Sequence, residues 1–160
     1  MSWKWKTASP EETWKLAQHL GTLLQGKEVL CLSGDLGAGK TLFSQGLANG
    51  LGVTEDVTSP TFTLMNVYQS GKGEMYHFDL YRLEDASQLW DIDFYTYVEG
   101  RGVALVEWPD AFWEEMPAEH LRIYLRYGTA QDEREIELEP HGEAYQRLCE
   151  ELKANAGIGS

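Results

Sequence analysis

Apolar side chains recur at helical spacing in several parts of the chain. One stripe follows Ser9-Pro10-Glu11-Glu12, which has the form of a capping box with proline at the first helical position, and it ends near Leu24. Another follows Lys40, and Gly50 and Gly52 provide its stop. From these stripes and the residues that border them, we expect helices at 9–24, 41–49, 85–97, 109–116 and 144–152.

Shorter runs between these helices predict strands. The segments 29–32 and 102–106 are uninterrupted apolar runs, typical of central strands that are buried on both faces. Other segments are rich in β-formers or alternate polar and apolar residues, and they predict two hairpins: 62–68 with 75–79, and 121–127 with 135–139. The order of elements places antiparallel hairpins beside an α/β core, so we expect a mixed sheet.

The composition is that of one folded domain. With 160 residues and 42% hydrophobic content, the chain can bury a single core, and we expect one domain over residues 1–160. Neither a long apolar run nor an apolar leader is present, which predicts a soluble cytoplasmic protein without membrane attachment. Cys31 and Cys149 are expected to be core thiols, and the four histidines lack the spacing of a zinc site.

The formal charge of −13 repels the phosphate backbone of nucleic acids. Direct binding to RNA is therefore disfavoured, and any role in RNA metabolism would run through a protein partner with a complementary basic surface. The same charge could equally serve solubility alone.

One segment carries a recognisable chemistry. Residues 34–41 read Gly-Asp-Leu-Gly-Ala-Gly-Lys-Thr, which is the pattern G-x-x-x-x-G-K-T directly after the strand 29–32. Its glycines let backbone N–H groups converge on phosphate oxygens, Lys40 adds a positive charge, and the Thr41 hydroxyl can bind Mg²⁺ at a helix N-terminus. An ordinary glycine-rich turn would show this pattern in roughly one chain of this length in a few hundred. The segment predicts binding and hydrolysis of a nucleoside triphosphate.

Two acids are candidates to complete such a site. Glu107 ends the buried strand 102–106, where a carboxylate commonly holds Mg²⁺, although it could simply emerge from the strand end. Asp79 is the best candidate to orient or deprotonate the attacking water, and its alternative role is to cap the turn before Tyr81. The hydroxyl-rich segment 58–61 could sense the third phosphate, and Trp108 should lie near the nucleotide.

Four segments in order, 34–41, 59–64, 76–83 and 105–109, resemble the bacterial TsaE (YjeE) family of tRNA threonylcarbamoyladenosine biosynthesis proteins. The resemblance implies an α/β, P-loop NTPase-like three-layer fold with a mixed central sheet and antiparallel hairpins. It also implies a small ATPase that supports N6-threonylcarbamoyladenosine formation at adenosine 37 of tRNA. Its partners would be the TsaB–TsaD complex, through which it would reach tRNA only indirectly.

The resemblance also assigns roles by motif. ATP would bind to Gly37, Ala38, Gly39, Lys40, Thr41, Leu42, Asp79 and Glu107. Thr41 and Glu107 would hold Mg²⁺, and Asp79, Lys40 and Glu107 would be the catalytic residues. The family's switch-like S-P-T falls on residues 59–61, and Arg134 is a candidate for its late base-contacting residue.

Two other functions remain open at this point. A small-molecule kinase would share the phosphate loop, but the chain has no obvious inserted lid. A non-catalytic module, in which nucleotide only orders residues 58–61 for a partner, would need no catalytic acid.

Overall fold

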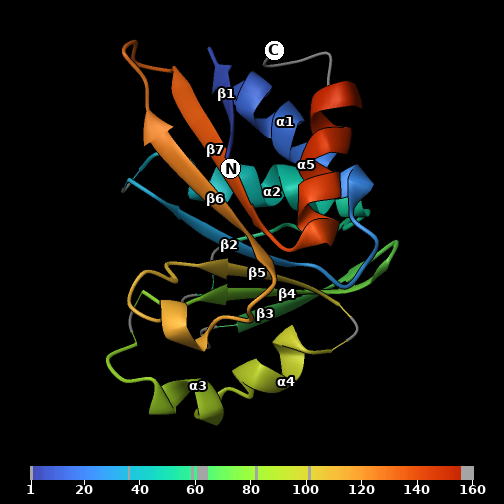
Figure 1. The fold of residues 1–160 in the computed structure, drawn as a ribbon, viewed down its shortest axis with the longest axis vertical. Helices are drawn as coiled ribbons and strands as arrows, with labels where there is room; N and C mark the ends of the chain where they lie inside the picture. Colours follow the sequence, from blue (N-terminus) through green and yellow to red (C-terminus); the bar gives the residue numbers. More distant parts are fainter. Residues whose placement is uncertain are drawn as a thin grey trace.

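In the part of the chain that the structure describes, seven strands form one sheet in the order β1-β7-β6-β2-β5-β4-β3 (Figure 1). The computed structural model describes residues 2–35, 37–58, 60, 65–81, 83–100 and 102–155. The strands are β1 Trp3–Thr7, β2 Val29–Gly34, β3 Met65–Ser70, β4 Gly73–Asp79, β5 Val103–Glu107, β6 His120–Tyr127 and β7 Arg134–His141. The helices are α1 Pro10–Leu23, α2 Lys40–Leu51, α3 Ser87–Asp91, α4 Phe94–Val98, α5 Glu143–Asn155 and the 3-10 turn η1 Trp113–Glu115.

The sheet is mixed, as the sequence predicts. Its four central strands, β6, β2, β5 and β4, pair in parallel, while β3, β7 and β1 pair antiparallel to their neighbours. The predicted hairpins are β3 with β4 and β6 with β7, although residues 62–64 of the first lie outside the described part of the chain. Because β2, β5 and β4 are parallel, their C-terminal ends lie on the same side of the sheet.

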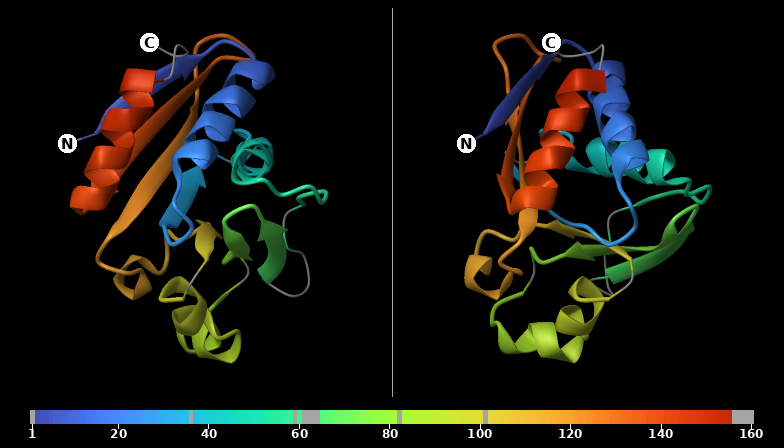
Figure 2. Two further views of the ribbon diagram at one scale, coloured as in Figure 1. Left: turned by 90° about the vertical axis from the view of Figure 1, so that its right-hand side faces the viewer. Right: turned by 45° about the vertical axis from the view of Figure 1, so that its right-hand side comes forward.

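Helices cover both faces of the sheet, which gives three layers. Figure 2 shows α1, α2 and α5 together on one face, and α3 and α4 below the β3–β5 half on the other. Alternation along β2 and β5 divides the core accordingly, because Leu32 and Leu105 pack with α1 and α2 while Cys31 and Val106 pack with α3 and α4. The three-layer α/β prediction is confirmed. Within the described residues, no helix is long and apolar enough to span a bilayer.

Glycines allow α1 and α2 to approach closely. A Cβ at Gly50 would lie 2.1 Å from the carbonyl oxygen of Gln18, and one at Gly46 would lie 2.5 Å from that of Trp14. Gly50 is therefore a residue of the helix interface, and its prediction as a helix stop was wrong. Gly52 does end α2, in the left-handed conformation that glycine favours.

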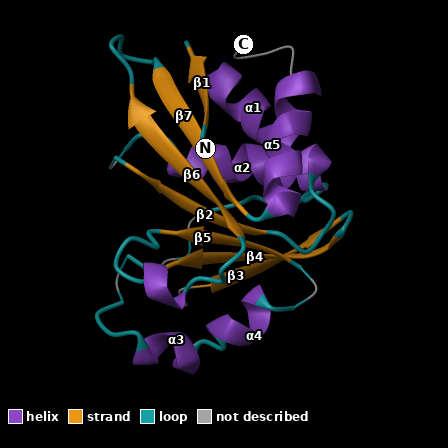
Figure 3. Cartoon of the chain, viewed as in Figure 1, coloured by secondary structure: helices purple, strands orange, loops and turns teal. Residues whose placement is uncertain are grey.

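Three other predictions need correction. Figure 3 shows a strand, β1, where none was expected, and it pairs with β7 so that Trp5 and Thr7 face the core. The predicted helix 109–116 contains only η1, which ends at Met116 because this residue precedes a proline and is extended. The predicted helix 85–97 is two short helices, divided where Asp93 adopts φ 56°.

Candidate active site

The segment 34–41 forms a loop between the central strand β2 and the first turn of α2, and Leu36 is the one residue of it that lies outside the described part. Gly39 has φ 107° and occupies the N-cap position of α2, with no atom within 4 Å of where its Cβ would be. Glycine is favoured there by the backbone conformation and leaves the space above the helix N-terminus open. Such a terminus attracts anions through its unpaired N–H groups.

Lys40 is the cation of this loop. Its side chain is 7% exposed, and Nζ donates to the carbonyl oxygens of Gly34 at 3.2 Å and Asp35 at 3.0 Å. The ammonium also lies 4.2 Å from the centre of the Trp108 ring. Burial lowers the pKa of Lys40, while nearby carboxylates, Glu107 foremost, act in the opposite direction. The positive charge is thus held at the mouth of the loop.

The two predicted acids come together because of strand register. Asp79 at the end of β4 lies opposite Glu107 at the end of β5, and Glu107 in turn lies opposite Leu32 of β2. Glu107 is 3% exposed. The Asp79 carboxylate accepts a hydrogen bond from the N–H of Tyr81 at 3.1 Å, so Asp79 also caps the turn that follows β4.

These residues line one cavity of about 430 Å³. Its lining is Gly37, Gly39, Lys40, Thr41, Leu42, Asp79, Glu107 and Trp108. Of the residues predicted to bind ATP or Mg²⁺, all but Ala38 line the cavity, and the side chain of Ala38 is buried. A volume of this size is in the range of small-ligand sites. Trp108 is one of the lining residues, and its ring is 4.9 Å from that of Tyr81. Its predicted position near a nucleotide stays a prediction.

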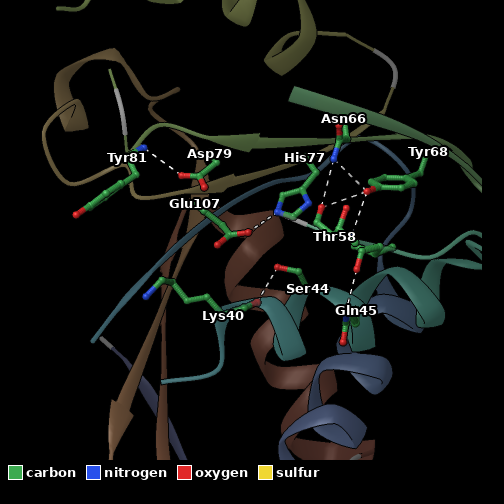
Figure 4. A network of polar contacts seen from close by, with 11 residues as sticks. Lys40, Ser44, Gln45, Thr58, Asn66, Tyr68, His77, Asp79, Tyr81 and Glu107 are labelled. Atoms are coloured by element: carbon green, nitrogen blue, oxygen red, sulfur yellow. Dashed lines mark hydrogen bonds and ion pairs between the residues drawn. The ribbon is translucent and has the colours of Figure 1, made fainter. Parts of the chain in front are cut away.

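Side chains of β3 and α2 hold the segment that precedes β3. Asn66 donates from Nδ2 to the carbonyl oxygen of Thr58 at 3.3 Å, and Tyr68 Oη contacts both the N–H and the carbonyl of Thr58 (Figure 4). Gln45 of α2 donates to the carbonyl oxygen of Val57 at 3.0 Å. Of the predicted switch, Ser59 and Thr61 lie outside the described residues, as does Arg82. The role of this segment stays a prediction.

Sequence reasoning missed His77 on β4. It is fully buried, and its Nε2 contacts Oε2 of Glu107. The signal was present, since His77 stands two residues before Asp79 on one strand and therefore shares its face. Without knowledge of the neighbouring strand, that face could not be related to Glu107.

Arg134, at the start of β7, lies behind the loop. Its Nε donates to the carbonyl oxygen of Ala38 at 3.0 Å, and its guanidinium is 4.9 Å from the centre of the Tyr127 ring. Arg134 therefore supports the loop from the sheet side. Its predicted contact with a base is not tested by this arrangement.

The oxygen-bearing side chains of the cavity suit a metal ion that binds together with a polyphosphate. In the described residues, no three His, Cys, Asp or Glu side chains are arranged to hold a metal ion. Thr41 and Glu107 both line the cavity, and they offer a hydroxyl and a carboxylate. Mg²⁺ favours oxygen ligands and is usually bound through one or two side chains together with substrate phosphates. The residues therefore fit Mg²⁺ better than a metal bound by protein alone.

Comparison with known proteins relates this arrangement to a family. The family model described as threonylcarbamoyl adenosine biosynthesis protein TsaE matches residues 7–136, which include the loop, Asp79 and Glu107. This chain belongs to the TsaE family. A TsaE protein of Bacillus subtilis is 44% identical over 98% of both chains, and one of Treponema pallidum is 42% identical over 80% of this chain and 93% of its own.

The fold of a TsaE relative agrees as well. The crystal structure of YdiB from Bacillus subtilis superposes with a TM-score of 0.78 at 39% identity, and the match covers 96% of this chain and 95% of that one. TsaE proteins are tRNA threonylcarbamoyladenosine biosynthesis proteins. The resemblance found in the four sequence segments is confirmed at the level of the family.

Proposed function

We propose that this TsaE protein is a Mg²⁺-dependent ATPase that assists the N6-threonylcarbamoyladenosine modification of tRNA at adenosine 37. The observation that carries the proposal is the single cavity in which Lys40, Thr41, Asp79 and Glu107 meet from three separate segments of the chain. An ordinary glycine-rich turn would not require two carboxylates from neighbouring strands to face it.

Each side chain has a task in such a reaction. The open N-terminus of α2 and the Lys40 ammonium would bind the phosphates, and Leu42 lines the same wall. Thr41 and Glu107 would hold Mg²⁺, which supplies charge neutralisation at the β- and γ-phosphate oxygens when bound. Lys40 now donates to two loop carbonyls, and phosphate oxygens would replace them as acceptors.

Asp79 is the proposed residue for the attacking water. Its carboxylate lines the cavity one strand away from Glu107, and the Tyr81 N–H fixes the orientation of Oδ1. A carboxylate held in this way can accept a proton or a hydrogen bond from water without rearranging. The hydrogen bond to Tyr81 supports this role and does not compete with it, because it restricts the rotamer.

The charge of the protein supports an indirect route to tRNA. A formal charge of −13 opposes contact with a phosphate backbone, so the modification would be carried out by partners, for which we propose the TsaB–TsaD complex. In the described residues we identify no arginine that points into the cavity. A transition-state arginine can raise the rate by roughly 10³ to 10⁵, so hydrolysis by the protein alone should be slow.

The proposal is tested by phosphate release from ATP, measured with and without the TsaB–TsaD complex. Lys40→Ala should abolish turnover, whereas the matched control Lys27→Ala, at an exposed lysine, should not. Undiminished hydrolysis by the Lys40 variant would disprove the site. Fast turnover by the pure wild-type protein would contradict dependence on a partner, and a phosphorylated acceptor in place of free phosphate would indicate a kinase.

A further inference from the structure

His77 lies behind Glu107 on the side away from the cavity. It is 0% exposed, Glu107 is 3% exposed, and the contact joins Nε2 of the ring to Oε2 of the carboxylate. Glu107 lines the cavity on its other side, together with Lys40. The glutamate is thus held between a buried ring and the space in which a nucleotide would bind.

Strand register produces this arrangement. On β5, Leu105 lies opposite His77 and Glu107 lies opposite Asp79, and the side chains of alternate residues share one face of the sheet. His77 is therefore one step farther into the core than Asp79, on the face that α2 covers. Figure 4 shows one oxygen of Glu107 directed at His77 and the other turned to the side of Lys40.

The contact also has a defined direction. A carboxylate can only accept hydrogen bonds, so Nε2 of His77 carries a proton and donates it to Glu107. A buried carboxylate needs such a donor, because it has lost its hydration. With Oε2 fixed by the ring, the glutamate loses the freedom to rotate, and its second oxygen has a set orientation.

The other ring nitrogen supports the same conclusion. Nδ1 of His77 is buried and has no hydrogen-bond partner among the described residues. Packing alone would be served by an apolar side chain that leaves no polar atom unpaired. Of the two nitrogens, only the one that faces Glu107 is used, which identifies that contact as the interaction that fixes the ring.

We propose that His77 is a positioning residue that sets the orientation of Glu107 for Mg²⁺ binding. The inference rests on the proposed function, because it assumes that Glu107 holds the metal of a magnesium–nucleotide complex. Hydrogen bonds from outside the ligand shell restrict the ligand rotamer in many metal sites, and their loss typically lowers metal affinity or activity by about 10- to 100-fold.

The test measures how much magnesium strengthens nucleotide binding. Calorimetry with a non-hydrolysable ATP analogue, with and without Mg²⁺, gives a ratio of two dissociation constants for each variant. His77→Leu removes the donor, and His77→Gln places an amide N–H near the position of Nε2. His77→Asn is equally polar but too short to reach Glu107. Phe78→Leu is the matched control, since Phe78 is also fully buried on β4 but packs against Phe94 on the other face.

We expect His77→Leu and His77→Asn to lower this ratio by roughly 10- to 100-fold, with metal-free binding nearly unchanged, and His77→Gln to restore most of it. Phe78→Leu should lower stability without changing the ratio. If the His77→Leu protein does not fold, the comparison of His77→Gln with His77→Asn tests the inference. Equal ratios in wild type and all His77 variants would overturn the inference while the proposed function stands. A wild type that binds nucleotide no better with Mg²⁺ would overturn both.

Discussion

Replacing Gly50 by alanine tests how closely α1 and α2 must pack. In an isolated helix this change is favourable by about 1 kcal/mol, because alanine has the highest helix propensity and glycine one of the lowest. In the protein, the new Cβ would lie 2.1 Å from the carbonyl oxygen of Gln18 and 3.0 Å from Cα of Gly21. Both contacts are with backbone, so no side chain can turn aside.

The magnitude follows from the distance that the helices must move. An ordinary contact of this kind is 3.4 Å or longer, so α1 and α2 would separate locally by roughly 1 Å. A gap of that size forfeits a quarter to a half of the dispersion attraction between facing side chains, and overpacking typically costs about 1–3 kcal/mol. Because both close contacts are with backbone, the cost should lie in the upper part of this range, at about 2–3 kcal/mol. After subtraction of the gain of about 1 kcal/mol in helix propensity, we expect the free energy of unfolding to fall by about 1–2 kcal/mol.

Urea unfolding followed by circular dichroism measures this difference in free energy. For a domain of 160 residues, the expected loss also lowers Tm by roughly 2–8 °C. Asn49→Ala is the control, because this neighbour on α2 is exposed and gives up only an exposed hydrogen bond with Gln18. A Gly50→Ala protein as stable as the wild type, or more stable, would refute the close packing described here.

Three further predictions concern the site and the core. Trp108 fluorescence should change when Mg²⁺ and ATP are added, because Lys40, now 4.2 Å from the centre of the Trp108 ring, would turn to the phosphates. Trp108→Phe should remove this change. An undiminished change in the Trp108→Phe protein, which keeps the other five tryptophans, would contradict the prediction. Burial raises the pKa of Cys31 and Cys149 from 9.0 to about 12, so both thiols should resist alkylation in the native protein at pH 8. The unfolded chain releases these protons near pH 9 and the folded chain does not, so the free energy of unfolding should fall as pH rises above about 9. Urea unfolding curves that show no such fall would contradict the burial of the two thiols.

The parts of the site that sequence could predict are those encoded locally. Residues 34–41 specify a loop, a cation and a helix start within eight positions, and the structure has each of them there. Glu107 was predictable because it ends a strand that reads as buried, and Asp79 because it ends a strand of a predicted hairpin. The structure brings the two together because β4 and β5 are parallel, so that their C-terminal ends meet.

Tertiary neighbours decided what sequence could not predict. The alternation Trp3-Lys4-Trp5-Lys6 is typical of a strand, but β1 is stable only beside β7, whose residues 134–138 are more than a hundred positions away. His77 meets Glu107 only because β5 inserts beside β4. Gly50 reads as a helix stop until the backbone of α1 is placed against it.

The spatial order of the strands has a consequence for synthesis on the ribosome. β5 lies between β2 and β4 although it follows both in the chain, so the acid from β4 cannot take its place relative to the loop after β2 until residue 107 has been translated. A nascent chain that ends before β5 would carry the whole glycine-rich motif and still lack Glu107 and Trp108 of the cavity lining. If the cavity binds a nucleotide as proposed, tight binding should therefore begin only when β5 has left the exit tunnel and entered the sheet.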